Sequence, residues 1–99
     1  MTKVTVLYGH PADSDGFEDY YAKKHLPLAL TIPGVRIETT KFSDGQDGTR
    51  PAFYRMAELY ADTPGEMQKA FDSSEGKMTT ADLANFATGG VTFLMGTVE

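Results

Sequence analysis

His25 is the side chain of this sequence best suited to acid–base chemistry. It stands on a helical repeat of aromatic and apolar residues, in which Phe17, Tyr21 and Leu28 mark the face that we expect to be buried. The imidazole is then directed toward a sheet near the C-terminal end of its helix, where the helix dipole favours the charged form and burial the neutral form. A histidine held between these influences, near its ordinary pKa of about 6.5, can act as a general base or acid. The alternative is a structural histidine that is hydrogen-bonded to a backbone carbonyl.

Further side chains are candidates for the same pocket. The predicted substrate-binding residues are Tyr21, Asn85, Tyr54, Phe86 and His10. Tyrosine offers an apolar ring with one hydrogen-bonding tip, and Asn85 is expected to face the sheet together with Phe86 and Met78. Each residue also has an ordinary structural alternative. Asn85 can simply end its helix, His10 and the proline after it can form a turn, and the tyrosines can belong to the core or to an interface.

The sequence carries no signature of a metal, nucleotide or covalent-catalysis site. Its two histidines have no short fixed spacing, and neither HExxH nor a clear set of two histidines and a carboxylate occurs. The phosphate-binding patterns GxGxxG and GxxxxGK[ST] and a nucleophile elbow are missing as well. We therefore expect a site that works without a metal, a flavin or a haem.

The elements that must position these residues alternate along the chain. Apolar and polar alternation predicts strands at 3–8, 35–42, 53–60 and 91–98. Helices are predicted at 14–25, 64–71 and 74–86, with Ser14, Thr63 and Ser74 as the residues that cap them. Pro27 is expected to stop or kink the first helix, because the residue before a proline avoids helical geometry.

This order predicts one α+β domain over residues 1–99, a ferredoxin-like βαββαβ fold with a four-stranded antiparallel sheet. Helices cover one face of the sheet, and apolar residues occur on both faces of its strands. A second copy of the chain is therefore expected to cover the other face, which predicts a homodimer. Arg55 is expected at that dimer interface, paired with an acidic residue such as Glu38 or Glu58.

Composition excludes several classes of function. The chain has 99 residues and a net charge of −5, whereas nonspecific nucleic-acid binding needs a basic surface. No apolar run is long enough to cross a membrane, and the N-terminus lacks the apolar stretch of a signal peptide. Cysteine is absent, which excludes disulfides and thiolate chemistry and fits a cytoplasmic protein.

Several stretches together carry a family likeness, namely VLY at 6–8, FEDYY at 17–21, HLPL at 25–28, YRMAELY at 54–60 and ADLANF at 81–86. In these stretches, which span nearly the whole chain, the sequence resembles the EthD family. YYxxxHLPL at 20–28 is the most specific of them. The resemblance implies a dimeric α/β barrel of ferredoxin-like protomers, with a cavity between helices and sheet in each protomer. By position it places His25 in that cavity, with Tyr21 and Asn85 as neighbours.

The resemblance leaves two functions open. The family is named for a component associated with ethyl tert-butyl ether degradation, alongside a cytochrome P450 system, and related barrels include cofactor-free monooxygenases and lactone isomerases. One hypothesis is therefore an oxidoreductase or isomerase that binds a small, largely apolar, oxygen-bearing molecule and uses His25 as acid or base. The other is a noncatalytic accessory protein that binds such a molecule and supports a partner oxygenase.

Overall fold

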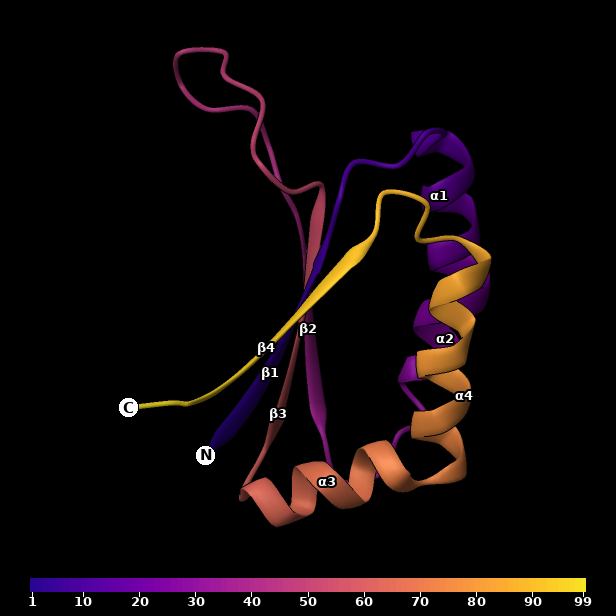
Figure 1. Cartoon of the computed structure of the whole chain (residues 1–99), viewed down its shortest axis with the longest axis vertical. Helices are drawn as coiled ribbons and strands as arrows, with labels where there is room; N and C mark the ends of the chain where they lie inside the picture. Colours follow the sequence, from indigo (N-terminus) through magenta and orange to yellow (C-terminus); the bar gives the residue numbers. More distant parts are fainter.

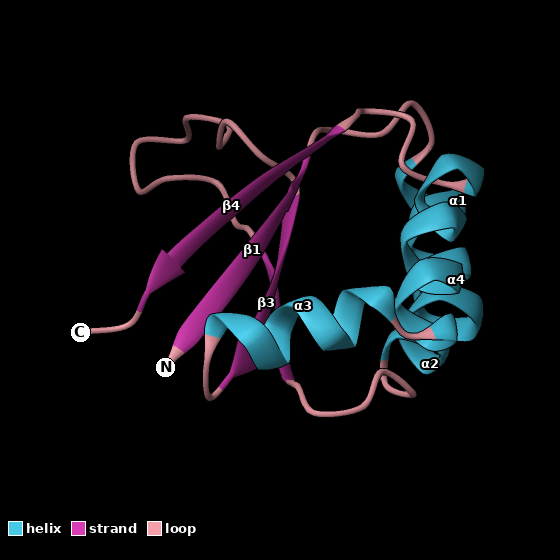
Figure 2. Ribbon diagram, turned by 60° about the horizontal axis from the view of Figure 1, so that its bottom comes forward, coloured by secondary structure: helices cyan, strands magenta, loops and turns pink.

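Four antiparallel strands form a sheet in the order β2-β3-β1-β4 in the computed structural model, which describes residues 1–99. The strands are β1 (Thr2–Tyr8), β2 (Arg36–Lys41), β3 (Arg55–Ala61) and β4 (Val91–Thr97). The helical segments are α1 (Ser14–Tyr20), η1 (Tyr21–His25), α2 (Leu26–Ala29), α3 (Pro64–Asp72), α4 (Ser74–Asp82) and η2 (Leu83–Asn85). All of them lie on one face of the sheet (Figures 1 and 2). The predicted ferredoxin-like α+β fold is confirmed.

The central strand β1 sets the position of the core. Its residues alternate, so that Val4, Val6 and Tyr8 are buried toward the helices while the residues between them are half-buried on the other face. Val6 lies between Ala57 of β3 and Phe93 of β4 in the register of the sheet. Each large apolar side chain that leaves water here contributes about 1.5–3 kcal/mol. The core therefore lies between sheet and helices.

The opposite face of the sheet is more polar than the sequence analysis predicted. It carries Leu7 and Met56 side by side near one end of β1 and β3, whereas Lys3 forms an ion pair of 3.0 Å with Glu58 farther along the strands. The side chain of Arg36 lies over the ring of Tyr60, 4.2 Å from the ring centroid. This face combines a small apolar patch with charged residues, and no helix covers it (Figure 2).

Two helices are capped one residue earlier than predicted. Asp13, not Ser14, accepts the backbone N–H of Gly16, and Ser73, not Ser74, accepts that of Gly76. Both capping residues have extended backbone angles, which an N-cap requires and a residue inside the helix lacks. Thr63 caps α3 as predicted. None of the helices is long and apolar enough to cross a membrane.

Helices α3 and α4 approach each other closely, and this contact sets the direction in which α4 leaves α3. A Cβ atom on Gly76 would collide with the backbone of Ala70 and Phe71, so only glycine permits this crossing. In Figure 1 α3 runs across the end of the layer while α4 lies alongside α1 and α2. This arrangement carries the C-terminal end of α4 to the helix that holds His25.

Candidate active site

His25 ends a wide helical turn that the sequence analysis did not predict. The helix does not stop at Pro27 but continues through η1 into α2, and Leu26 keeps helical angles. The backbone N–H of Leu26 donates to the carbonyl of Tyr21, five residues earlier, which is the bond of a π-helix. This wider turn leaves room for Pro27, which has no N–H to donate. Such turns occur frequently at functional sites.

The wide turn also keeps a stripe of residues on the buried face. Phe17, Tyr21, His25 and Ala29 are all buried at steps of four residues. In a regular α-helix each such step drifts by about 40° around the axis. A turn that takes more residues offsets part of this drift. His25 consequently remains directed into the molecule and is only 4% exposed.

Asp82, at the end of α4, is the partner that orients His25. Its Oδ2 atom lies 2.9 Å from Nδ1 of His25. Its Oδ1 atom accepts hydrogen bonds from the Tyr20 hydroxyl at 2.6 Å and from the Asn85 amide at 2.9 Å. Burial raises the pKa of Asp82, but these three hydrogen bonds outweigh it and lower the pKa of Asp82 overall. Asp82 is therefore a carboxylate at neutral pH.

This pairing sets the protonation of the imidazole. A carboxylate only accepts hydrogen bonds, so Nδ1 of His25 carries the proton and Nε2 presents its lone pair. Burial lowers the pKa of His25, and Asp82 opposes that shift only in part. At neutral pH the ring is uncharged, and Nε2 is able to take up a proton. The arrangement meets the geometric requirements of a general base with an orienting carboxylate.

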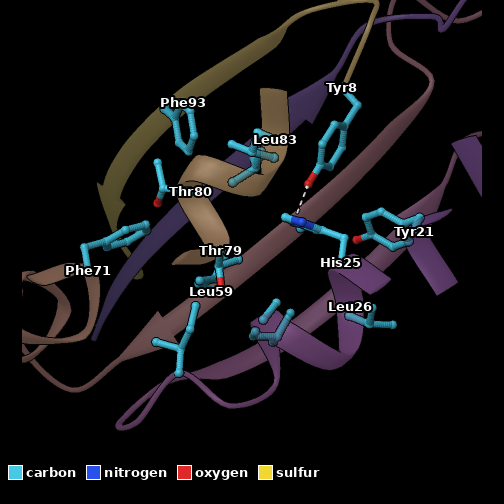
Figure 3. A pocket seen from close by; sticks show the side chains of 15 residues that line it. Tyr8, Tyr21, His25, Leu26, Leu59, Phe71, Thr79, Thr80, Leu83 and Phe93 are labelled. Atoms are coloured by element: carbon cyan, nitrogen blue, oxygen red, sulfur yellow. Dashed lines mark hydrogen bonds between the residues drawn. The ribbon is translucent and has the colours of Figure 1, made fainter. Parts of the chain in front are cut away.

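Tyr8 stands on the other side of the ring. Its hydroxyl lies 3.4 Å from Nε2 of His25, a long hydrogen bond drawn as the dashed line in Figure 3. Burial raises the pKa of Tyr8, so its hydroxyl keeps its proton at neutral pH. Because this bond is long, a better-placed donor on a ligand can displace the Tyr8 hydroxyl from Nε2.

A cavity of about 40 Å³ lies against these groups, between helices and sheet. Its polar end is formed by Tyr8, Tyr21 and His25, while the rest of its wall is mostly apolar (Figure 3). The hydroxyls of Thr79 and Thr80 also face this region, but they donate to carbonyls of their own helix at 2.8 and 2.9 Å. A space of this size holds a few water molecules, so an organic substrate needs further room next to it.

The structure brings together only some of the residues predicted for the site. Tyr21 and His25 line the cavity. Phe86 packs against the His25 ring at 4.5 Å between centroids, behind the cavity wall. Asn85 is exposed and reaches Asp82 instead of the cavity, and Met78, expected beside it on the sheet side, is 58% exposed.

His10 and Tyr54 belong to a neighbouring cluster. Nε2 of His10 donates to the carbonyl of Pro51 at 2.7 Å, and its ring packs edge-on against Tyr54. Tyr54 in turn packs against Phe17, so both rings support the helix that carries His25 and neither lines the cavity.

The prediction that Arg55 lies at a dimer interface is wrong. It faces the helices, donates to Glu18 at 2.9 Å and lies 4.6 Å from the centroid of the Tyr21 ring. Burial raises the pKa of Tyr21, and Arg55 partly opposes that shift. Arg55 pairs with Tyr8 in the register of the sheet, so its side chain lies on the face that the helices cover and not on the uncovered face expected for an interface residue. There it contacts Tyr21.

Sequence reasoning missed Asp82, Tyr8 and Tyr20 as site residues. Asp82 lies within the ADLANF stretch at 81–86, in which Asn85 was the predicted site residue. A signal was present, because an acidic residue at the end of a helix is unfavourable unless a partner compensates it. Here that partner is the imidazole of His25. No three side chains among histidine, aspartate and glutamate lie close enough together to hold a metal ion.

Comparison with known protein families and sequences gives one consistent result. The family model of the EthD domain matches residues 10–90. An uncharacterized 11.0 kDa protein of Rhodococcus erythropolis, encoded in the thcB–thcC intergenic region, is 45% identical over 94 residues. That alignment covers 95% of this chain and 91% of the relative.

Solved structures support the same fold. A crystal structure of an ethyl tert-butyl ether degradation family protein from Bacillus halodurans has a TM-score of 0.92 at 33% identity and covers 100% of this chain and 99% of its own. A dimeric protein of ferredoxin-like fold from Bacteroides fragilis has a TM-score of 0.69 at 12% identity, covering 98% and 95%. SnoaB, a cofactor-independent oxygenase from Streptomyces nogalater, has a TM-score of 0.63 at 14% identity, covering 98% and 90%. The last two similarities are evidence of the fold alone.

Proposed function

This chain belongs to the EthD family, and we propose that it is a small enzyme in which His25 removes a proton from a largely apolar, oxygen-bearing molecule. One observation carries the proposal: the carboxylate of Asp82 holds Nδ1 of His25 at 2.9 Å and leaves Nε2 beside an apolar cavity. General bases of this kind contribute about 10²–10⁴-fold to a reaction rate.

The remaining polar groups suit the product of such a step. Removal of a proton from a carbon next to a carbonyl leaves negative charge on the carbonyl oxygen. The hydroxyls of Tyr8 and Tyr21 both face the cavity and keep their protons at neutral pH, because burial raises the pKa of each. They are therefore the donors that would stabilise that oxygen, while the Asp82 carboxylate stabilises the imidazolium that forms.

Two fates of the deprotonated substrate fit this site. In an isomerisation, His25 returns the proton to a different carbon. In an oxygenation, the carbanion gives its electrons to O2, a carbon–oxygen bond forms, and the proton on His25 passes to the terminal oxygen to give a hydroperoxide. The fold is compatible with the oxygenase route, because SnoaB, which shares it, is a cofactor-independent oxygenase.

The mostly apolar wall of the cavity also fits a second candidate. The protein can act as a noncatalytic carrier that binds an apolar molecule near His25 and serves a partner oxygenase. In that case His25 contributes a hydrogen bond and no proton transfer.

Hydrogen–deuterium exchange of an enolisable ketone separates the two candidates. We would incubate 2-indanone with the protein in D2O and follow loss of the α-proton signal by NMR. The enzyme hypothesis predicts protein-dependent exchange that His25→Gln abolishes and that His10→Gln, the change of the only other histidine, leaves intact. Exchange at the buffer rate with all three proteins would reject proton transfer and leave the carrier.

We also propose that the protein forms a homodimer through the sheet face that no helix covers. Leu7 and Met56 form an apolar patch on this face, and the ion pair of Lys3 and Glu58 lies on the same face. The description of a related fold as dimeric supports this proposal. A buried apolar centre with a polar rim is the usual composition of a protein interface.

A further inference from the structure

A second space adjoins the site beside His25, and we propose that it binds an apolar tail of the substrate. The proposal rests on the proposed function, because it places the oxygen-bearing head of the same molecule at His25. A groove of about 370 Å³ opens on the helix side of the sheet at the edge strand β4. Pockets for small organic ligands have volumes of about 300–1,000 Å³, so the groove has the capacity that the cavity of about 40 Å³ lacks.

The two spaces share part of their walls. Phe71, Thr80 and Phe93 line both the cavity and the groove, so these three side chains form the partition between them. Figure 3 shows them together at one end of the cavity, with Tyr8, Tyr21 and His25 at the other. The partition is partly exposed, since Phe93 is 46% exposed. Exposed side chains change rotamer within nanoseconds, so a ligand can join the two spaces without moving the backbone.

The surface of the groove is apolar and adaptable. Phe93 and Met95 supply its exposed apolar surface, at 46% and 64% exposure, whereas Val4 and Met67 also line it but are almost fully buried. Methionine side chains are flexible and polarizable, which lets them pack against tails of different shape. Covering these side chains would contribute the binding free energy that the small polar end cannot supply.

The residues that line the two spaces also indicate the charge of the substrate's head group. Neither space is lined by a lysine or an arginine, and the only titratable groups at the polar end are the neutral imidazole of His25 and two protonated tyrosines. A carboxylate or phosphate buried there would have no positive partner and would be costly to desolvate. The ligand class is therefore an uncharged, weakly acidic oxygen head, such as a phenol or an enolisable aryl ketone, with an extended apolar tail.

A series of para-alkylphenols tests this arrangement. We would measure the binding of phenol and of 4-ethyl-, 4-butyl- and 4-hexylphenol by isothermal titration calorimetry at pH 7. Burial of each methylene is expected to tighten binding by up to ~4-fold. Gln68→Trp should fill the groove without touching the cavity, because Gln68 is exposed on α3 and lines only the groove. Lys69→Trp is the matched control, since Lys69 is exposed on the same helix and lines neither space.

The expected result is that Gln68→Trp loses the affinity gained with tail length but still binds phenol, whereas Lys69→Trp behaves as the wild type. Hexylbenzoate, with the same tail and a charged head, should bind at least ~10-fold more weakly than hexylphenol. Affinity that does not change with tail length, while phenol still binds in a His25-dependent manner, would overturn the tail site and leave the proposed function standing. Absence of binding by every phenol would overturn both.

Discussion

The carboxylate of Asp82 and the imidazole of His25 lie 2.9 Å apart although 57 positions separate them in the sequence. The contact joins the end of α4 to the end of η1, so it forms only when both helices are packed on the sheet. Both side chains are nearly buried, at 13% and 6% exposure. An ion pair or hydrogen bond that is shielded from water is stronger than one at the surface, which gives this contact its influence on the chemistry of His25.

Removal of the charge in Asp82→Asn should slow the exchange of 2-indanone by ~10²-fold or more, because the carboxylate both orients the imidazole and stabilises its charged form. The pH at which exchange is half-maximal should fall as well, since Asp82 raises the pKa of His25. Asn85→Ala is the control, because it removes only one of the donors to Asp82. An unchanged pH profile in Asp82→Asn would show that the carboxylate does not act through His25.

The rate of exchange should rise with pH and reach a plateau near neutrality. Burial lowers the pKa of His25 below its ordinary value of 6.5, and only the neutral ring can accept a proton. The midpoint of the profile is therefore expected below pH 6.5, and the same midpoint should appear when the ring nitrogens of His25 are titrated by NMR. A midpoint above 6.5 would mean that Asp82 outweighs burial.

Stability should decrease as the pH falls below about 6.5. The pKa of His25 is lower in the folded than in the unfolded chain, so the unfolded chain binds the proton first and gains stability from it. The loss amounts to up to ~1.4 kcal/mol for each pH unit between the two pKa values. Urea unfolding at pH 7 and pH 5 measures it, and His25→Gln should show a smaller difference than the wild type. The stabilisation that the Asp82 carboxylate provides is lost only at lower pH, below its ordinary pKa of 3.8, because its folded pKa lies below that value.

Tyr8→Phe should separate ligand binding from stability. The Tyr8 hydroxyl is buried, and its hydrogen bond to His25 is long at 3.4 Å, so its loss should change the free energy of unfolding by less than ~1 kcal/mol. Binding of phenol should nevertheless weaken by ~5-fold or more, because a donor to the ligand oxygen is lost. Calorimetry and thermal unfolding of the same variant provide both values. Unchanged binding would place the ligand oxygen away from Tyr8.

The order of strands and helices could be predicted from the sequence because local alternation and capping residues such as Thr63 determine it. The burial of His25 also followed from its spacing to Phe17 and Tyr21. The partner of His25 could not be predicted in this way. Its identity depends on where α4 ends and on which side of the last turn of α4 faces η1. Asn85 and Asp82 are only three residues apart, and a small change in helix geometry decides which of them reaches the imidazole. Arg55 was misplaced for a similar reason, because its face depends on the phase of β3.

Leu7→Arg should convert the proposed homodimer into a monomer. Leu7 lies on the uncovered sheet face, opposite Met56, and a charged side chain there would be buried without a partner in the dimer. Light scattering coupled to size-exclusion chromatography at micromolar concentration measures the mass. Leu30→Arg is the matched control, because Leu30 is 64% exposed on the helical side and should leave the assembly unchanged. A wild-type monomer, or a dimer that survives Leu7→Arg with an intact circular dichroism spectrum, would reject this face as the interface.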